Sequence, residues 1–212
     1  MGLQIPVQDI AIRSVEAADF DWCANLIFAA GPGLFSYVFA STADKALATL
    51  REAFSAPRHA FSHDHVQLLE VCDQPAGLVL GYSGAVKHRA EEQIQGIMAH
   101  ILPINRVPRI LVNLADLSRI RQDVASEDYY VLSLGIVPEF RNRGLGTALL
   151  QDTEMTAREL GCRTLCLDVA YSNTRAIRFF ERLGYEIACS KTSHRFSNMT
   201  DAGGLHRMEK IL

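Results

Sequence analysis

Several features that would place this 212-residue chain in a special class are missing from its sequence. The five cysteines form an odd set without a C-x-x-C pair, which argues against a disulfide framework and favours reduced thiols in a cytoplasmic compartment. No apolar run is long enough to span a bilayer, so we expect no membrane partner. The formal net charge is -3 and no Lys/Arg run is present, so we expect no nucleic-acid partner.

What is present is the composition of an ordinary globular protein. Hydrophobic residues make up 49% and charged residues 21% of the chain, and no internal repeat or low-complexity tract occurs. A chain of this length can bury one sizeable core. One domain of α/β class is therefore the simplest prediction.

Hydrophobic periodicity predicts both strands and helices. The predicted strands are 10–15, 66–72, 77–85, 129–137, 165–169, 185–190 and 205–212, and the predicted helices are 17–28, 34–39, 43–54, 144–160 and 173–183. The turn between the second and third strands is placed at 73–76. Residues 87–124 are predicted to be mostly helical with interruptions at Pro103 and Pro108. Residues 197–204 are predicted to form a polar loop.

The segment 136–150 carries most of the functional information. An apolar strand runs into Pro138, and a short basic turn then opens directly into an amphipathic helix. Gly144 and Gly146 lack a Cβ, so a bulky anion can approach the backbone closely. The free amides and the positive end of a helix favour phosphate. The segment is therefore predicted to bind a pyrophosphate.

Three phosphate-binding loops compete for this assignment. A P-loop requires Gly-x4-Gly-Lys-Ser/Thr, and no such Lys is present. The dinucleotide fingerprint requires a third Gly where this chain has Leu149. The third pattern, Arg-x-x-Gly-x-Gly after an apolar strand, is matched by residues 141–146. A glycine-containing turn that binds no ligand is the remaining interpretation.

Residues 141–146 resemble the coenzyme A loop of the Gcn5-related N-acetyltransferase (GNAT) family. Residues 173–185, Asn-x-x-Ala-x-x-Phe-Phe-x-x-x-Gly-Tyr, resemble a later motif of the same family. The spacing between the two blocks leaves room for one helix and one strand, as the family requires. The resemblance is specific over residues 129–187 and only architectural before them.

The resemblance implies a GNAT-like acyl-CoA N-acyltransferase fold of α/β class. Its central sheet would be mixed and mainly antiparallel, with six to seven strands flanked by helices, and its fourth and fifth strands would splay at a parallel pair to admit coenzyme A. A single domain would cover 1–212, with the acceptor side in 1–128 and the acetyl-CoA-binding core in 129–190. Helices in 17–55 and the stretch 87–124 would wall the acceptor cleft.

The resemblance also assigns contacts with the co-substrate acetyl-CoA. Backbone groups of Leu134, Gly135 and Ile136 would pair with the pantetheine arm like an added strand. Asn173 would hydrogen-bond near this arm or cap the helix that follows it, and Phe180 would lie against the cofactor. The amides that would hold the pyrophosphate are those of Arg141, Asn142, Arg143, Gly144, Leu145, Gly146 and Thr147.

Two features of the loop depart from a simple glycine turn. Asn142 takes a position that is often Gly in the family, and Asn tolerates a left-handed backbone better than most residues, so the turn is expected to survive. Arg141 and Arg143 would add positive charge or be solvated surface side chains.

The implied reaction moves an acetyl group from acetyl-CoA to a primary amine by direct attack in a ternary complex. The family often uses a Tyr to protonate the leaving thiolate, and Phe180 stands at that position and has no proton to give. Tyr171, Cys189 and Ser190 are substitute candidates. The leaving thiolate could also depart unaided.

The base that deprotonates the amine is equally open. Glu127 and Asp128 lie at the entrance of the strand and are expected to be solvated, whereas Ser133 could hold a water molecule or the amine. Asp168 points opposite to its neighbours on the strand and would face the cleft or pair with an Arg. Ser133 and Tyr171 are thus the candidate catalytic residues.

Other functions stay open at this stage. No His/Cys/Asp cluster has ligand spacing, so we expect no metal site. An acyl-CoA-binding regulatory module with little or no turnover, or a scaffold domain without a ligand, would fit the same motifs. A small-molecule amine or a protein amine would be the acceptor, and family members often form homodimers through late strands.

Overall fold

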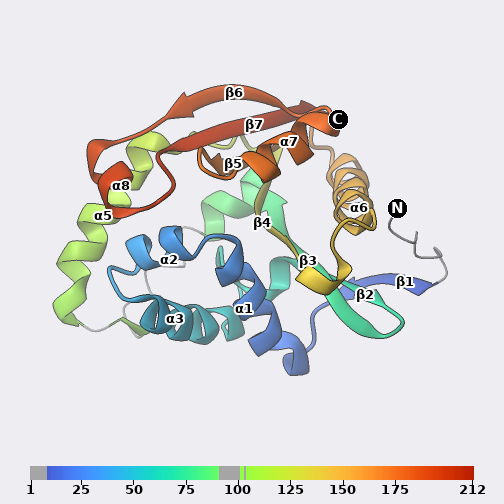
Figure 1. Ribbon diagram of the computed structural model, residues 1–212, viewed down its shortest axis with the longest axis horizontal. Helices are drawn as coiled ribbons and strands as arrows, with labels where there is room; N and C mark the ends of the chain where they lie inside the picture. Colours follow the sequence, from blue (N-terminus) through green and yellow to red (C-terminus); the bar gives the residue numbers. More distant parts are fainter. Residues whose placement is uncertain (1–8, 91–100, 103) are drawn as a thin grey trace.

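The computed structural model describes residues 9–90, 101–102 and 104–212 of the chain. At its centre is a seven-stranded sheet with the order β1-β2-β3-β4-β5-β7-β6 (Figure 1). Neighbouring strands run antiparallel except β4 and β5, which run parallel. The mixed, mainly antiparallel sheet flanked by helices is therefore confirmed.

The elements follow the order expected from periodicity. The strands are β1 (Ile10–Ser14), β2 (Val66–Val71), β3 (Gln74–Ser83), β4 (Asp128–Ile136), β5 (Thr164–Ala170), β6 (Glu186–Lys191) and β7 (Leu205–Ile211). The α-helices are α1 (Phe20–Ala30), α2 (Pro32–Val38), α3 (Ala43–Ser55), α5 (Val107–Ile120), α6 (Leu145–Glu159), α7 (Thr174–Arg182) and α8 (His194–Met199). Residues 84–90 are also helical.

The parallel pair β4–β5 is short, and its two strands then diverge. Pairing runs from Asp128 opposite Thr164 to Val131 opposite Leu167, after which β4 continues beside β3 alone and β5 beside β7. At the point of divergence the β3–β4 register shifts by one residue, so that Leu132 is an extra residue in β4. Such a bulge bends a strand. The predicted splay of the fourth and fifth strands is confirmed.

The sheet carries a hydrophobic core on each face. On one face, side chains of α1, α2 and α3 pack on β2 and β3 and on Tyr130 of β4. On the other, side chains of α6 and α7 pack on strands β2 to β5 and on Met208 of β7. Phe35 and Phe39, in the core on the α1–α3 face, are 5% and 2% exposed. The cleft between β4 and β5 therefore lies between two helical layers.

Three local predictions need correction. The β2–β3 turn lies at Cys72–Asp73, both with positive φ, because β3 already begins at Gln74. Pro108 does not interrupt a helix but lies in the first turn of α5, where a missing N–H costs nothing. The loop 197–204 contains part of helix α8, whose Ser193 side chain caps it. The portion of 87–124 at 91–100, and Pro103, lie outside the described residues.

Candidate functional site

The loop before α6 passes twice through the left-handed backbone region. Asn142 has φ 62°, and Gly144, the residue preceding α6, has φ 85°. A Cβ at Gly144 would meet nothing within 4 Å, so the backbone angle and not the available space favours glycine here. The prediction that Asn142 accommodates the turn is confirmed.

Consecutive main-chain amides of this loop have no protein acceptor. Within the described chain, the N–H groups of residues 142–146 donate no hydrogen bond, whereas the Arg141 amide donates to Pro138 O at 3.2 Å and the Thr147 amide to Gly144 O at 3.0 Å. The amides of Arg141 and Thr147, which the sequence analysis also assigned to the pyrophosphate, are thus already bonded within the protein. Free amides at the positive end of a helix favour an anionic ligand.

Three arginine side chains make contacts at this loop. Nε of Arg141 donates to the carbonyl of Ile136 at 2.8 Å, which ties the loop back to β4. The guanidinium carbon of Arg143 lies 5.6 Å from the centre of the Phe140 ring. Arg175 of α7 donates to Asn142 Oδ1 at 3.0 Å. Arg175 was not among the sequence candidates, because only the fold brings α7 against this loop.

The segment Leu134–Ile136 exposes one main-chain edge to the cleft. On its other edge, residues 134–136 pair with residues 77–79 of β3. A Cβ at Gly135 would lie 2.9 Å from Leu26 Cγ, so α1 packs directly on this part of β4. An extended ligand can therefore add to the open edge as a strand would.

A cavity of about 350 Å³ occupies the splay between β4 and β5. Segments of α1, α2, β4, β5, α7 and the α8–β7 connection line it. Ser133 lines this cavity and is 8% exposed, and its Oγ is a buried atom without a hydrogen-bond partner among the described residues. A buried hydroxyl without a partner is costly unless a ligand or water satisfies it. Ser133 is therefore a candidate contact for a substrate.

Asn173 and Phe180 also line the cavity. Oδ1 of Asn173 accepts the amide of Ala176 at 3.1 Å, so the predicted capping of α7 is confirmed. Phe180 is 7% exposed and packs edge-on against Tyr185, with ring centroids 5.7 Å apart. Phe180 supplies an apolar wall and no exchangeable proton.

The structure does not bring Tyr171 to Ser133. Tyr171 follows β5, and its ring packs on His206, with centroids 4.2 Å apart, and on Gly204. It is not among the residues that line the cavity. The other two substitute acids are engaged as well, since Ser190 Oγ lies 2.7 Å from His206 Nδ1 and Cys189 Sγ accepts from Gln122 at 2.7 Å.

Asp168 pairs with arginine, which was one of its two expected alternatives. Arg207 of β7 donates to both of its carboxylate oxygens, and the Tyr130 hydroxyl donates to Oδ2 at 2.9 Å. Arg121, at the end of α5, approaches the same oxygen with Nε at 3.5 Å. Burial raises the pKa of Tyr130 well above its usual 10.0. The protonated Tyr130 phenol therefore cannot act as a base, and the Asp168 carboxylate is already engaged by Arg207 and Tyr130.

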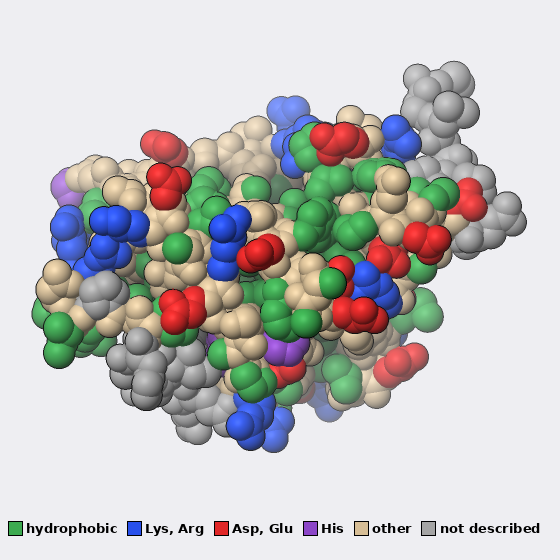
Figure 2. Space-filling model, turned by 90° about the horizontal axis from the view of Figure 1, so that it is seen from below, with side chains coloured by type: hydrophobic (Ala, Val, Ile, Leu, Met, Phe, Trp, Pro, Cys, Tyr) green, Lys and Arg blue, Asp and Glu red, His purple; other side chains and the backbone are tan. Residues whose placement is uncertain are grey.

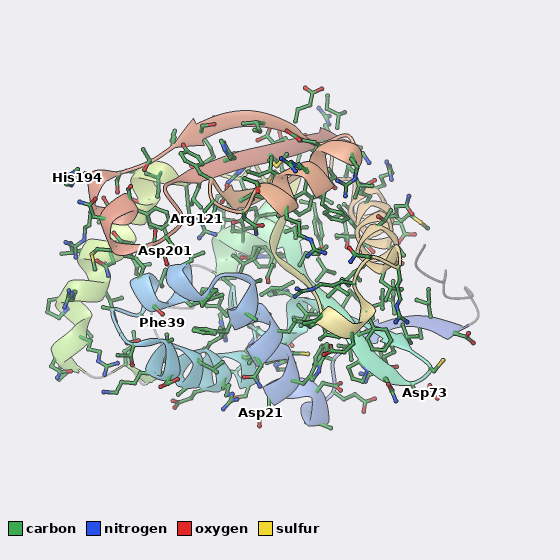
Figure 3. The ribbon with its side chains drawn as sticks, in the orientation of Figure 1. Asp21, Phe39, Asp73, Arg121, His194 and Asp201 are labelled. Carbon is green, nitrogen blue, oxygen red and sulfur yellow. The ribbon has the colours of Figure 1, made fainter. Side chains whose placement is uncertain are left out.

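One acidic residue at the cavity was not predicted from the sequence. Asp201, in the α8–β7 connection, is exposed and lines the splay cavity together with Arg121. Figure 3 shows both side chains between α2 and the strands β5 and β7. Of the two carboxylates expected to be solvated, Glu127 is exposed, whereas Asp128, at the start of β4, is half-buried. Among the described residues no group of three or more His, Cys, Asp or Glu could hold a metal ion.

Positive and negative side chains alternate on one face of the molecule. The face in Figure 2, seen from below relative to Figure 1, intersperses Lys and Arg with Asp and Glu. Across the described residues, no helix combines the length and apolar character needed to cross a bilayer.

Comparison with known proteins points to one family. The sequence model of the acetyltransferase (GNAT) family matches residues 48–185. N-alpha-acetyltransferase 60 of Xenopus tropicalis is 45% identical over 56 residues, which cover 24% of this chain and 23% of that protein. The match thus spans less than a quarter of this curated relative.

Solved structures share the fold at low identity. The structure of an N-acetyltransferase from Staphylococcus aureus Mu50 superposes with a TM-score of 0.69 at 16% identity, covering 94% of this chain and all of that one (100%). That of a PaiA N-acetyltransferase from Thermoplasma acidophilum, in complex with coenzyme A, gives a TM-score of 0.53 at 12% identity, covering 96% and 99% of the two chains.

Proposed function

Because this chain belongs to the acetyltransferase (GNAT) family, we propose that it transfers an acetyl group from acetyl-CoA to a primary amine. The observation that carries the proposal is the row of free amides at residues 142–146 beside the open edge of β4. The amides suit a diphosphate, and the edge suits the amide-bearing pantetheine arm. The Thermoplasma protein of the same fold binds coenzyme A.

Glycine at position 146 is favoured by the close packing of α6 against α7. A Cβ at Gly146 would lie 3.3 Å from Cζ of Phe179, closer than a relaxed contact. Gly146 therefore lets the first turn of α6 lie close to α7, beside the mouth of the cleft.

The chemistry follows from direct attack in a ternary complex. The neutral amine attacks the thioester carbonyl, the carbon–nitrogen bond forms, and the carbon–sulfur bond breaks to release the thiolate. Amides of β4 near Ile136 would stabilise the charge on the carbonyl oxygen. Ser133 would hold the amine or a water molecule that takes its proton, and Asp201 would attract a cationic amine to the cleft.

Proton supply to the thiolate does not depend on Phe180. The phenol of Tyr171 lies outside the splay cavity, so its role as general acid would require a movement of the α8–β7 connection. A thiol titrates near ~8.5, so the thiolate is a tolerable leaving group and solvent can protonate it.

The chain would divide the work along its sequence. Residues 129–190 would form the acetyl-CoA-binding core, and residues 1–128 would supply the acceptor side, within one domain over 1–212. This division agrees with the two helical layers, because α6 and α7 lie on one face and α1 to α3 on the other.

Steady-state release of coenzyme A thiol over a panel of amines tests the proposal, with coenzyme A affinity measured by calorimetry in parallel. We expect binding of coenzyme A and amine-dependent thiol release. A regulatory acyl-CoA-binding module is the second candidate, favoured by Phe180 and by the fully paired Asp168. Binding without amine-dependent release over the whole panel would establish that second candidate.

A further inference from the structure

A second cavity, of about 590 Å³, lies beside the splay. Its walls come from the end of α5, from Tyr130 of β4, and from β5 and β7. Its charged lining consists of Lys87, Arg121, Asp123, Asp168, Lys191 and Arg207. The volume is that of a site for a small organic molecule. We call it the basic pocket.

The basic pocket has an excess of positive charge even when Lys87 is left aside. Arg121, Lys191 and Arg207 then face the two carboxylates of Asp123 and Asp168. Asp168 is already satisfied by the buried Arg207, and its side chain is 8% exposed. The Arg121 side chain shares that carboxylate and is still 27% exposed. A cation is thus presented to the pocket with its charge only partly compensated.

Arg121 has hydrogen-bonding capacity to spare. A guanidinium carries five N–H donors, and in the described structure Arg121 donates one hydrogen bond, to the Tyr130 hydroxyl. Its guanidinium carbon lies 5.6 Å from the centre of the Tyr130 ring, which holds the group in place. The planar fork of N–H donors of a guanidinium matches the two oxygens of a carboxylate, so a fixed Arg side chain with free donors is well suited to bind one.

The basic pocket adjoins the proposed reaction site. Leu117, Arg121 and Asp168 line both the basic pocket and the splay cavity. Tyr130, which lines the pocket, belongs to the core on the α1–α3 face. Leu80, which pairs with Ser133 across β3 and β4, belongs to the same core. The pocket and Ser133 therefore lie on the same face of the sheet, the acceptor side. A molecule held by Arg121 can therefore reach the splay with its other end.

We propose that the acceptor is a small amine that also carries a carboxylate, and that Arg121 and Lys191 of the basic pocket bind this carboxylate while the amine faces the splay. This inference rests on the proposed acetyl transfer and names the acceptor class for it. A diamine, by contrast, would bring a second cation against Arg121.

Matched acceptors test the proposal. The value of kcat/KM is measured for 5-aminopentanoate, pentylamine and 1,5-diaminopentane, which differ only in the group at the far end. γ-Aminobutyrate and 6-aminohexanoate allow for the distance between pocket and splay. The best ω-amino acid is expected to exceed pentylamine by about tenfold or more, as a charge-assisted hydrogen bond provides. A ratio near one at every length, or a preference for the diamine, overturns the proposal.

Substitutions localise the effect. Arg121→Met and Lys191→Met should each reduce the ratio of carboxylate to methyl acceptor severalfold, whatever the absolute rate. Lys191 lies at the end of the edge strand β6, so its variant stays informative if Arg121→Met fails to fold. Arg119→Met on α5 and Lys45→Met on α3 are matched controls at exposed positions outside the pocket and should leave the ratio unchanged. A ratio that persists in both pocket variants contradicts the assignment.

A binding measurement separates this inference from the proposed function. Calorimetry compares 5-acetamidopentanoate with N-pentylacetamide on the protein loaded with coenzyme A. If the acid binds preferentially and this preference depends on Arg121, but no amine causes thiol release from acetyl-CoA, the pocket is retained and acetyl transfer is rejected. Thiol release without any preference for the carboxylate, in turnover and in binding, would retain acetyl transfer and reject the pocket.

Discussion

Arg207 on β7 donates two hydrogen bonds to Asp168 on β5, from Nε to Oδ1 at 2.8 Å and from Nη2 to Oδ2 at 3.2 Å. The two residues stand opposite each other in the antiparallel β5–β7 register. Their side chains are 2% and 8% exposed. This buried pair ties β5, which forms one side of the splay, to β7. Because Arg207 already neutralises Asp168, the charge of Arg121 beside it is only partly compensated.

Removing one partner of this pair should be strongly destabilising. Arg207→Met leaves a buried carboxylate without its main counter-ion, and we expect the free energy of unfolding at neutral pH to fall by about 3–5 kcal/mol. Urea denaturation followed by circular dichroism measures it. Adding Asp168→Asn to the same protein should recover part of the loss, because the uncompensated charge disappears. A single variant as stable as the parent protein would show that the pair is not coupled as the structure describes.

Gly146→Asp should weaken coenzyme A binding by about tenfold or more, because a carboxylate would stand beside the diphosphate. Titration calorimetry measures the affinity. Gly146→Asn adds the same bulk without charge, so the difference between the two variants isolates the electrostatic part. Met155→Asp places the same charge on an exposed position of α6, 59% exposed, and should leave the affinity unchanged. Equal affinity of Gly146→Asp and the parent protein would remove the diphosphate from this loop.

Ser133→Ala should lower kcat/KM without lowering stability. The Ser133 hydroxyl has no partner in the described structure, so its removal loses no hydrogen bond and relieves a buried polar atom. We expect an unchanged or raised melting temperature and a loss of roughly tenfold or more in kcat/KM. Ser133→Thr, which keeps the hydroxyl, is the matched control. Full activity in Ser133→Ala would exclude the hydroxyl from the reaction.

Asp116 should make stability depend on acidic pH. Burial alone would raise its pKa, but hydrogen bonds from Ser193 and Tyr37 to Oδ2, each 2.6 Å long, outweigh burial and lower the pKa below the ordinary 3.8. A lowered folded-state pKa means that this stabilisation is complete above the unfolded-state pKa and is lost as the pH falls through the folded-state value.

The stability difference between the parent protein and Asp116→Asn should therefore be constant from neutral pH to about 5 and shrink below about 4. Denaturation at a series of pH values measures it. Asp44→Asn, at an exposed position in the first turn of α3, serves as the control. A difference that grows on acidification would have the wrong sign for the described hydrogen bonds.

The sequence determined those features that depend on neighbouring residues. The alternation of β5 and the amphipathic pattern of α6 follow from local periodicity, and the left-handed turns at Asn142 and Gly144 follow from the conformational tolerance of these residue types. The cap of α7 by Asn173 is equally local, since donor and acceptor are three residues apart. For these features a short stretch of chain contains the whole physical cause.

Only the tertiary structure decided which side chains meet across the sheet. Arg207 and Asp168 are 39 residues apart, and Arg175 and Asn142 are 33 residues apart, and nothing local relates them. The same holds for Asp201 at the cleft and for Tyr171, which packs on Gly204 and away from Ser133. Sequence patterns report the propensity of one segment, whereas these contacts depend on strand register and on the packing of segments that are distant in the chain.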